Sequence, residues 1–169
     1  IGGSADGTVV NVKDSTITAS KIGYGIISFV KSDITVDNSD ISGYGAVYMQ
    51  AGSDNSTVTV QNGSVLTGTS VSAAESFGTI VVQGYSDGTY SKVNNVTVTV
   101  DATSTVKAMG TNQSAVLNSD ATNTFDIPAK SVVVDDGAFA NSTFVTTAAE
   151  LKSALAVLSK AIRNFIPSE

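Results

Sequence analysis

The chain has 169 residues, contains no cysteine, histidine or tryptophan, and carries a formal net charge of −6 at a sequence pI near 4.4. This composition excludes a Ser-His-Asp or Cys-His catalytic arrangement and an ordinary zinc site. Because a surface that binds duplex nucleic acid needs clustered Lys and Arg, the acidic balance also argues against nucleic acid as a partner.

The length fits one domain with its own hydrophobic core. The chain has no run of eighteen apolar residues, so we expect no membrane span in it. The first ten residues, IGGSADGTVV, have neither an initiator Met nor the basic and apolar regions of a signal peptide. We therefore expect a processed product or a piece of a longer protein.

A repeated pattern organises most of the chain. Four segments align: residues 8–19 (TVVNVKDSTITA), 32–43 (SDITVDNSDISG), 56–68 (STVTVQNGSVLTG) and 95–108 (NVTVTVDATSTVKA). Their shared columns are an opening aliphatic (Val10, Ile34, Val58, Val98), a valine (Val12, Val36, Val60, Val100), a small residue (Ser15, Ser39, Gly63, Thr103) and a closing aliphatic (Ile17, Ile41, Val65). In the fourth unit Thr105 falls in the closing column, so we expect Val106 to replace it after a one-residue slip.

The spacing of the valine column predicts the architecture. The valine at 12 recurs after 24 residues at 36 and after 24 more at 60, but the next one, at 100, comes 40 residues later. We therefore expect an insertion within residues 67–93. Period-two alternation inside each unit predicts strands, and a period in the low twenties predicts a solenoid whose coils bury their apolar faces against one another.

An aromatic-glycine motif recurs between these units. It reads IGYGII at 22–27, SGYGAV at 42–47 and SFGTIV at 76–81, and we expect it, like QSAVLNS at 113–119, to form another strand of each coil after a bend at the glycine. Tyr24, Tyr44 and Phe77 are expected to hold one position in successive coils. They either fill a corner of the solenoid, which the phenylalanine favours, or form an exposed ladder of rings that contacts sugars.

These features resemble the right-handed parallel β-helix of pectin-lyase-like proteins and of bacterial autotransporter passenger domains. The segments STVTVQNGSVLTG and DITVDNSDISGYGAV carry the resemblance, which covers residues 8–135. It implies an all-β right-handed parallel β-helix, and a role in adhesion, self-association or display rather than catalysis.

The composition changes after residue 143, where residues 144–169 are predicted to form an amphipathic helix. Thr147 and Glu150 form a capping box. The apolar stripe then runs through Leu151, Leu155, Leu158, Ile162 and Phe165 and ends before Pro167. We expect this helix to cover the open end or the flank of the solenoid. A coiled-coil seam with partner chains and the first capping segment of a second β-helix are alternatives.

The best candidate for a ligand-binding segment is the inserted loop QGYSDGTYSKV at 83–93. It places Tyr85, Asp87, Tyr90 and Lys92 on a polar excursion from a rigid scaffold, where binding residues tend to lie. Tyr24 and Tyr44 are the second candidates. An insertion without a ligand is the competing interpretation.

The positions of the acidic residues fit turns better than a catalytic or metal-binding site. Asp37 and Asp40 flank one bend, and Asp135 and Asp136 precede a glycine, where a weak Ca²⁺ site is the only cofactor site that we consider. Outward residues should form a polar ladder through Asn11, Thr35, Thr59 and Thr99, extended by Thr57 and Thr97. Paired threonines resemble an ice-binding face, but Asp33 and Val9 interrupt the pairing, so ordinary strand threonines are favoured.

We therefore predict a β-helix of about four to five coils at residues 1–143 and a capping or packing helix at 144–169. The predicted function is a non-catalytic structural or adhesive module of a bacterial cell-surface or secreted protein, located outside the cell. Its expected partners are a glycan or a host-surface ligand, or other copies of itself. Alternatives are a polysaccharide-binding or polysaccharide-degrading domain, and a piece of a trimeric phage tail fibre with the terminal stripe at its axis.

Overall fold

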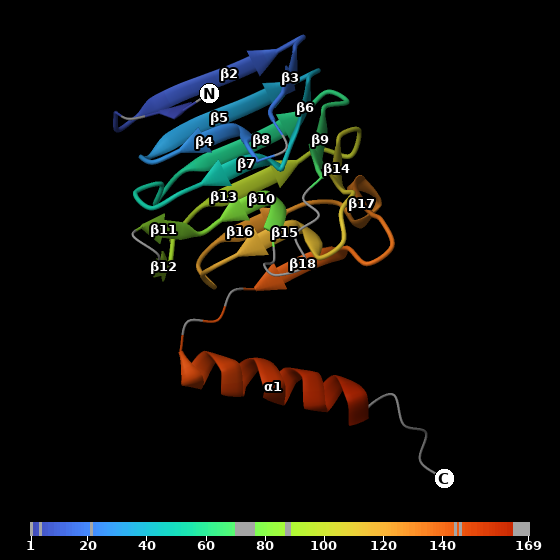
Figure 1. Cartoon of the computed structure of the whole chain (residues 1–169). Helices are drawn as coiled ribbons and strands as arrows, with labels where there is room; N and C mark the ends of the chain where they lie inside the picture. Colours follow the sequence, from blue (N-terminus) through green and yellow to red (C-terminus); the bar gives the residue numbers. More distant parts are fainter. Residues whose placement is uncertain are drawn as a thin grey trace.

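The computed structural model describes residues 2–3, 5–20, 22–69, 77–86, 89–143, 145 and 147–163, and the side chains of the helix as far as residue 156. Three parallel sheets account for most of this part of the chain (Figure 1). Sheet 1 contains β2 (Thr8–Lys13), β5 (Ser32–Asp37), β8 (Thr57–Gln61), β13 (Thr97–Val100) and β16 (Thr124–Asp126). Sheet 2 contains β3 (Thr16–Thr18), β6 (Asp40–Gly43), β9 (Val65–Gly68), β14 (Thr105–Ala108) and β17 (Val132–Val134). Sheet 3 contains β1 (Gly2–Gly3), β4 (Tyr24–Ser28), β7 (Gly45–Met49), β10 (Phe77–Val82), β15 (Gln113–Asn118) and β18 (Phe139–Thr143).

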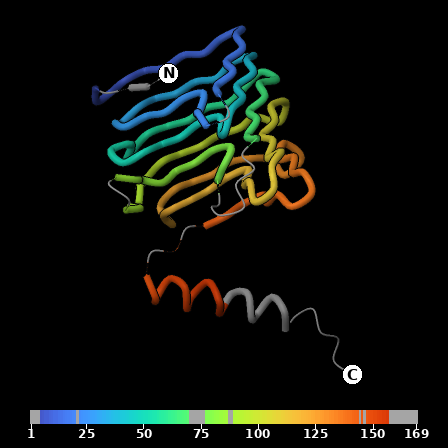
Figure 2. The backbone as a smooth tube through the Cα atoms, in the orientation of Figure 1, coloured from blue at the N-terminus to red at the C-terminus, as the bar shows by residue number. Residues whose placement is uncertain are grey.

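The chain visits the sheets in a fixed order, one strand of sheet 1, then sheet 2, then sheet 3, before it starts the next coil. The described residues form five such coils, which begin with β2, β5, β8, β13 and β16. Figure 2 shows these coils stacked along one axis, with the first and the last coil at opposite ends. The predicted all-β parallel β-helix is therefore confirmed.

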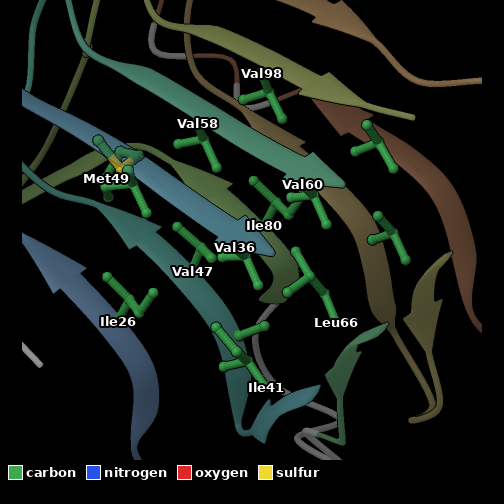
Figure 3. Close-up of a cluster of buried hydrophobic side chains, with 14 of the residues drawn as sticks. Ile26, Val36, Ile41, Val47, Met49, Val58, Val60, Leu66, Ile80 and Val98 are labelled. Atoms are coloured by element: carbon green, nitrogen blue, oxygen red, sulfur yellow. The ribbon is translucent and has the colours of Figure 1, made fainter. Parts of the chain in front are cut away.

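The core runs through the middle of the stack and consists of the predicted columns. Val10 pairs with Ile34, Ile34 with Val58, and Val58 with Val98. The second column, from Val12 to Val100, is in register in the same way. Sheet 3 contributes Ile26, Val47 and Ile80, and sheet 2 contributes Ile41 and Leu66, so side chains of all three sheets meet in one cluster (Figure 3).

The closing column differs from the prediction at the third coil. Ile41 pairs with Leu66 and not with Val65, which pairs with Asp40, so Leu66 is the buried residue. The cause is the turn at Asn62 and Gly63, which adds one residue and in which both residues have positive φ, 59° and 79°. Two successive positive φ values favour an Asn-Gly sequence. The slip therefore occurs one coil earlier than expected, and Val106 stacks directly on Leu66.

The same turn changes the column of small residues. Ser64 and Ser104 replace the predicted Gly63 and Thr103, and both serines are buried. They continue a ladder that begins at Ser15 and Ser39. In this ladder the backbone N–H of each serine donates to the hydroxyl of the serine in the next coil, at 3.0, 3.1 and 3.2 Å.

The extra residues of the third coil lie in two places. Residues 69–76 connect β9 to β10, and of these the structure describes only Thr69. After β10, the strands β11 (Gly84–Ser86) and β12 (Thr89–Ser91) form an antiparallel hairpin, which lies outside the three parallel sheets. The hairpin of β11 and β12 therefore lies directly beside sheet 3.

The helix α1 (Ala148–Arg163) follows the last coil and lies beyond it (Figure 1). The predicted capping box is present, since Thr147 N–H donates to Glu150 Oε2 at 3.1 Å and Glu150 N–H donates to Thr147 Oγ1 at 3.2 Å. Leu151 and Leu155 are each 52% exposed, so these two side chains do not form the packing expected of the helix. The side chains of Leu158 and Ile162, and all of Phe165 and Pro167, lie outside the described part.

Candidate functional site

Aromatic side chains of successive coils gather on sheet 3. The rings of Tyr24 and Tyr48 are 4.8 Å apart, those of Tyr24 and Tyr44 are 5.9 Å apart, and those of Tyr44 and Phe77 are 4.4 Å apart. Tyr24 pairs in register with Gly45 rather than with Tyr44, so the predicted alignment of the tyrosines is wrong by one residue. Tyr24 and Tyr44 nevertheless remain in edge contact.

Gly45 creates the space for this cluster. A Cβ atom placed at Gly45 would lie 2.3 Å from Cε1 of Tyr24, which is closer than real Cβ atoms come. Gly45 has no positive φ, so the motif needs glycine here for close approach of a ring to the backbone. The expected sharp bend at this glycine is therefore not its main role.

The hairpin adds two more rings. Tyr85 of β11 and Tyr90 of β12 are directly opposite each other, with ring centroids 5.0 Å apart. They are 45% and 39% exposed, respectively. Asp87, predicted beside them, lies outside the described residues.

Gln50 fixes the hairpin to the sheet. Its side chain is buried, its Oε1 accepts hydrogen bonds from the backbone N–H groups of Tyr85 and Ala51, and its Nε2 donates to the hydroxyl of Tyr48 at 3.1 Å. One buried amide thus positions an aromatic ring of the sheet and the first strand of the hairpin together. Buried amides with all of their hydrogen bonds formed make local geometry rigid.

A pocket of about 250 Å³ lies between these groups. Its described lining consists of five aromatic residues, two aliphatic residues and one amide: Tyr24, Tyr48, Phe77, Tyr85, Tyr90, Val81, Leu117 and Gln83. The described lining contains no acidic or basic side chain, and burial raises the pKa of Tyr48 to about 12 and that of Tyr24 further. The pocket is therefore apolar, aromatic and neutral.

Gln83 is the unusual member of this lining. Its side chain is only 4% exposed, and its Nε2 has no hydrogen-bond partner among the described residues. Buried polar groups are almost always hydrogen-bonded, so an unpaired amide in the wall of a pocket points to a missing partner.

The structure brings together three of the predicted site residues, Tyr24, Tyr85 and Tyr90, in this pocket. Tyr44 contacts the cluster from outside the lining. The sequence reasoning missed Tyr48 and Gln83 as site residues. The alternation of β7, in which Tyr48 lies between the core residues Val47 and Met49, is the signal that could have identified Tyr48 as outward-facing.

Lys92 lies away from the pocket. Its Nζ is 3.4 Å from a carboxylate oxygen of Asp120 and also contacts Glu150 at the start of α1. The hydrogen bond with Glu150 is the main cause of the raised pKa of Lys92. This lysine therefore connects the base of the hairpin to the helix.

Asp101 and Asp37 accept hydrogen bonds at the turns between sheet 1 and sheet 2. Asp101 accepts hydrogen bonds from the backbone N–H groups of Asn62, Thr103 and Ser104 at 2.8, 3.0 and 2.8 Å. Asp37 accepts hydrogen bonds from the side chains of Asn62 and Gln61, which lower its pKa. These contacts join turns of neighbouring coils.

Two further pairs of aspartates lie close together at or near turns. Asp135 and Asp136 lie in and beside the turn before β18, and the described residues contain no group of three or more acidic side chains that could hold a metal ion. Asp14 and Asp40 line one shallow pocket of about 300 Å³ together with Asn38, whose Nδ2 donates to Asp14 at 2.7 Å. The second pair therefore shares a cavity, as Asp120 and Glu150 do in another pocket of about 350 Å³, where both contact Lys92.

The predicted polar ladder on sheet 1 is present. Asn11, Thr35, Thr59 and Thr99 pair in register across four coils. In the neighbouring column Asp33 pairs with Thr57, which donates a hydrogen bond to it at 2.8 Å. The rank of threonines is therefore interrupted where the sequence indicated.

Within the described residues, α1 lacks the length and the continuous apolar character that a membrane-crossing helix requires. No family model, no curated protein and no solved structure matches this chain.

Proposed function

We propose that this chain is a non-catalytic binding module, the structural and adhesive part of a bacterial cell-surface or secreted protein, which binds carbohydrate in the aromatic pocket on sheet 3. The observation that carries the proposal is the convergence of five aromatic rings from three coils and a hairpin on one small cavity. The resemblance of the coils to autotransporter passengers supports display outside the cell.

The chemistry of sugars fits this lining. A pyranose ring has faces of C–H groups that pack against aromatic rings, and hydroxyl groups at its rim that exchange hydrogen bonds with polar side chains. Tyr85 and Tyr90 supply exposed rings, and Gln83 supplies an amide. A hairpin that extends from a rigid scaffold is also a common place for recognition residues.

The absence of a carboxylate from the described lining supports binding without catalysis. Most enzymes that hydrolyse glycosides use two carboxyl groups that flank the bond to be cleaved. A degrading enzyme on this scaffold would need a pair outside the aromatic pocket, such as Asp14 and Asp40, which line the shallow pocket at the turns between sheet 1 and sheet 2. Polysaccharide cleavage that is lost in an Asp14→Asn, Asp40→Asn variant would favour that second function.

A role in self-association rests on the helix. The exposed Leu151 and Leu155 offer an apolar stripe to a second copy or, in the tail-fibre alternative, to two more copies. The mass of the protein in solution distinguishes a monomer, a dimer and a trimer.

The test of the main proposal is a glycan array, probed with and without Ca²⁺. The probes are the wild type, the double variant Tyr85→Ala, Tyr90→Ala, and the control Phe29→Ala, which removes a 52% exposed ring outside the pocket. We expect saturable binding by the wild type and by the control, and at least a tenfold loss in the double variant, because stacking of a sugar on these rings is removed. Equal binding by all three proteins, or no binding at all, would overturn the proposal.

A further inference from the structure

We infer that the pocket accepts one neutral hexopyranose ring, and that the side-chain amide of Gln83 donates a hydrogen bond to an oxygen of that ring. This inference rests on the proposed carbohydrate binding and names its ligand. It follows from the size of the pocket, its charge and the unpaired amide.

The size of the pocket limits the ligand. Sites for drug-sized molecules usually have volumes of about 300 to 1,000 Å³. At about 250 Å³ the cavity is slightly smaller, so it has room for one ring and not for a chain of several sugars. The rest of a longer glycan would extend past Tyr85 and Tyr90, which are the more exposed part of the wall.

The charge of the pocket selects against acidic sugars. An anion loses its hydration when it enters an apolar cavity, and a cationic side chain would have to compensate for that loss. No described lining residue is a cation, and Lys92, at the base of the hairpin, is already paired with Asp120 and Glu150. Uronic and sialic acids therefore find no counter-charge here.

Gln83 and Gln50 occupy equivalent places in successive coils, and this comparison identifies the amide that serves a ligand. Val82 pairs with Met49, and each glutamine directly follows one of these two residues. Gln50 uses its amide to hold Tyr48, Ala51 and the hairpin. The Gln83 side chain lines the pocket, and its Nε2, which is inaccessible to solvent, has no partner among the described residues. An oxygen of a sugar in the cavity supplies the missing acceptor once rotation of the Gln83 side chain exposes this Nε2 to the cavity.

The test measures binding of single sugars by tyrosine fluorescence. The chain has five tyrosines and no tryptophan, and four of the tyrosines line the pocket, so the intrinsic emission reports on this site. The neutral probes are the methyl pyranosides of glucose, galactose and mannose. The anionic probes are glucuronic acid and N-acetylneuraminic acid. We expect saturation with at least one neutral probe and at least tenfold weaker binding of both acids.

Two matched variants identify the role of the amide. Gln83→Leu keeps the approximate volume of the side chain and removes its donor, so we expect affinity for the neutral sugar to fall about threefold to tenfold, the value of one hydrogen bond. The melting temperature should stay the same or rise, because the Nε2 that is removed has no hydrogen-bond partner among the described residues. Gln50→Leu breaks the contacts of the hairpin and should lower the melting temperature.

The outcomes separate this inference from the broader proposal. Equal binding of acidic and neutral sugars, unchanged affinity in Gln83→Leu, or a fall in its melting temperature equal to that of Gln50→Leu would overturn the inference. If none of the monosaccharides binds, while the array shows glycan binding that depends on Tyr85 and Tyr90, the inference fails and the proposed function stands. If the array also shows no binding, both fail.

Discussion

Single residues at the corners decide which side chains enter the core. Leu66 is fully buried between Ile41 and Val106 of the neighbouring coils, whereas the adjacent Val65 is half-buried and lies on the outer side of β9. The two residues differ because the Asn62–Gly63 turn is one residue longer than the turn of the coil before it. In a strand, a shift by one residue moves every side chain to the other face.

This difference predicts a matched pair of stability effects. Leu66→Ala leaves a cavity in the core and should lower the free energy of unfolding by about 2–5 kcal/mol. Val65→Ala removes a side chain at the surface and should lower it by less than about 1 kcal/mol. Urea unfolding followed by circular dichroism measures both. Equal losses, or a larger loss for Val65→Ala, would contradict the register described above.

At the scale of elements, buried serines join the turns between sheet 1 and sheet 2. Ser39, Ser64 and Ser104 are nearly inaccessible, and each accepts a hydrogen bond from the backbone of the preceding coil. A turn that enters the interior must satisfy its backbone N–H groups, and a short hydroxyl side chain does this without filling the core.

Removal of one member of this ladder should destabilise the whole stack. Ser64→Ala deprives the buried N–H of Ser39 of its acceptor, and we expect a loss of about 1–3 kcal/mol in the free energy of unfolding. Ser15→Ala is the control, because Ser15 is exposed at the first coil and its hydroxyl donates only to Lys13 O among the described contacts. If Ser15→Ala lowers the free energy of unfolding as much as Ser64→Ala does, the hydrogen bonds between coils do not contribute to stability.

The terminal helix is the second element with a clear prediction. Its exposed residues 151–156 and its ion pairs through Lys92, which is 35% exposed, contribute little to the stability of the coils. A chain that ends at residue 145 should therefore melt within about 3 °C of the full chain, as expected for a loss below 1 kcal/mol. The last coil has an open cavity of about 600 Å³ lined by Phe125, Ile127 and Val132. A large drop in melting temperature, with new binding of a hydrophobic dye, would show that the helix covers this cavity in solution.

For the whole molecule, stability depends on contacts between neighbouring coils, as in other repeat proteins. Several of these contacts use carboxylates at the turns, and their hydrogen bonds lower the pKa values of Asp101, Asp37 and Asp120. For Asp101 the main cause is the hydrogen bond from the backbone N–H of Asn62, one coil away.

These lowered pKa values predict acid sensitivity. A carboxyl group with a lower pKa in the folded state binds protons more readily in the unfolded chain, so its stabilising effect is complete above the unfolded pKa, about 3.9, and is lost as pH falls through the folded value. We expect the urea midpoint to be constant between pH 7 and 5 and to fall steadily from pH 4 to 2. Asp101→Asn should lower the midpoint at pH 7 and flatten the fall. The control Asp6→Asn removes the same formal charge from an exposed turn, and a variant of Asp101 that behaves like this control would refute the prediction.

The architecture could be predicted from the amino-acid sequence, because the same pattern of residues recurs in successive coils. The valine columns, the spacing of 24 residues between the first three of them and the polar ladder from Asn11 to Thr99 all reflect one stacking rule, and that rule predicts the solenoid. The same holds for the capping box of α1, in which Thr147 and Glu150 lie within one turn. Such features depend on neighbours in the chain or on a constant period, and both can be read from the sequence.

The register at the third coil and the composition of the pocket, in contrast, could be learned only from the folded chain. The register depends on the length of one turn, which changes the face of Leu66 by a single residue. The pocket combines Tyr24, Tyr48 and Gln83 of different coils with the hairpin, and Gln50 binds the hairpin through the backbone N–H of Tyr85. These residues follow no common period in the sequence, so their meeting is set by side-chain contacts between coils and not by the repeat.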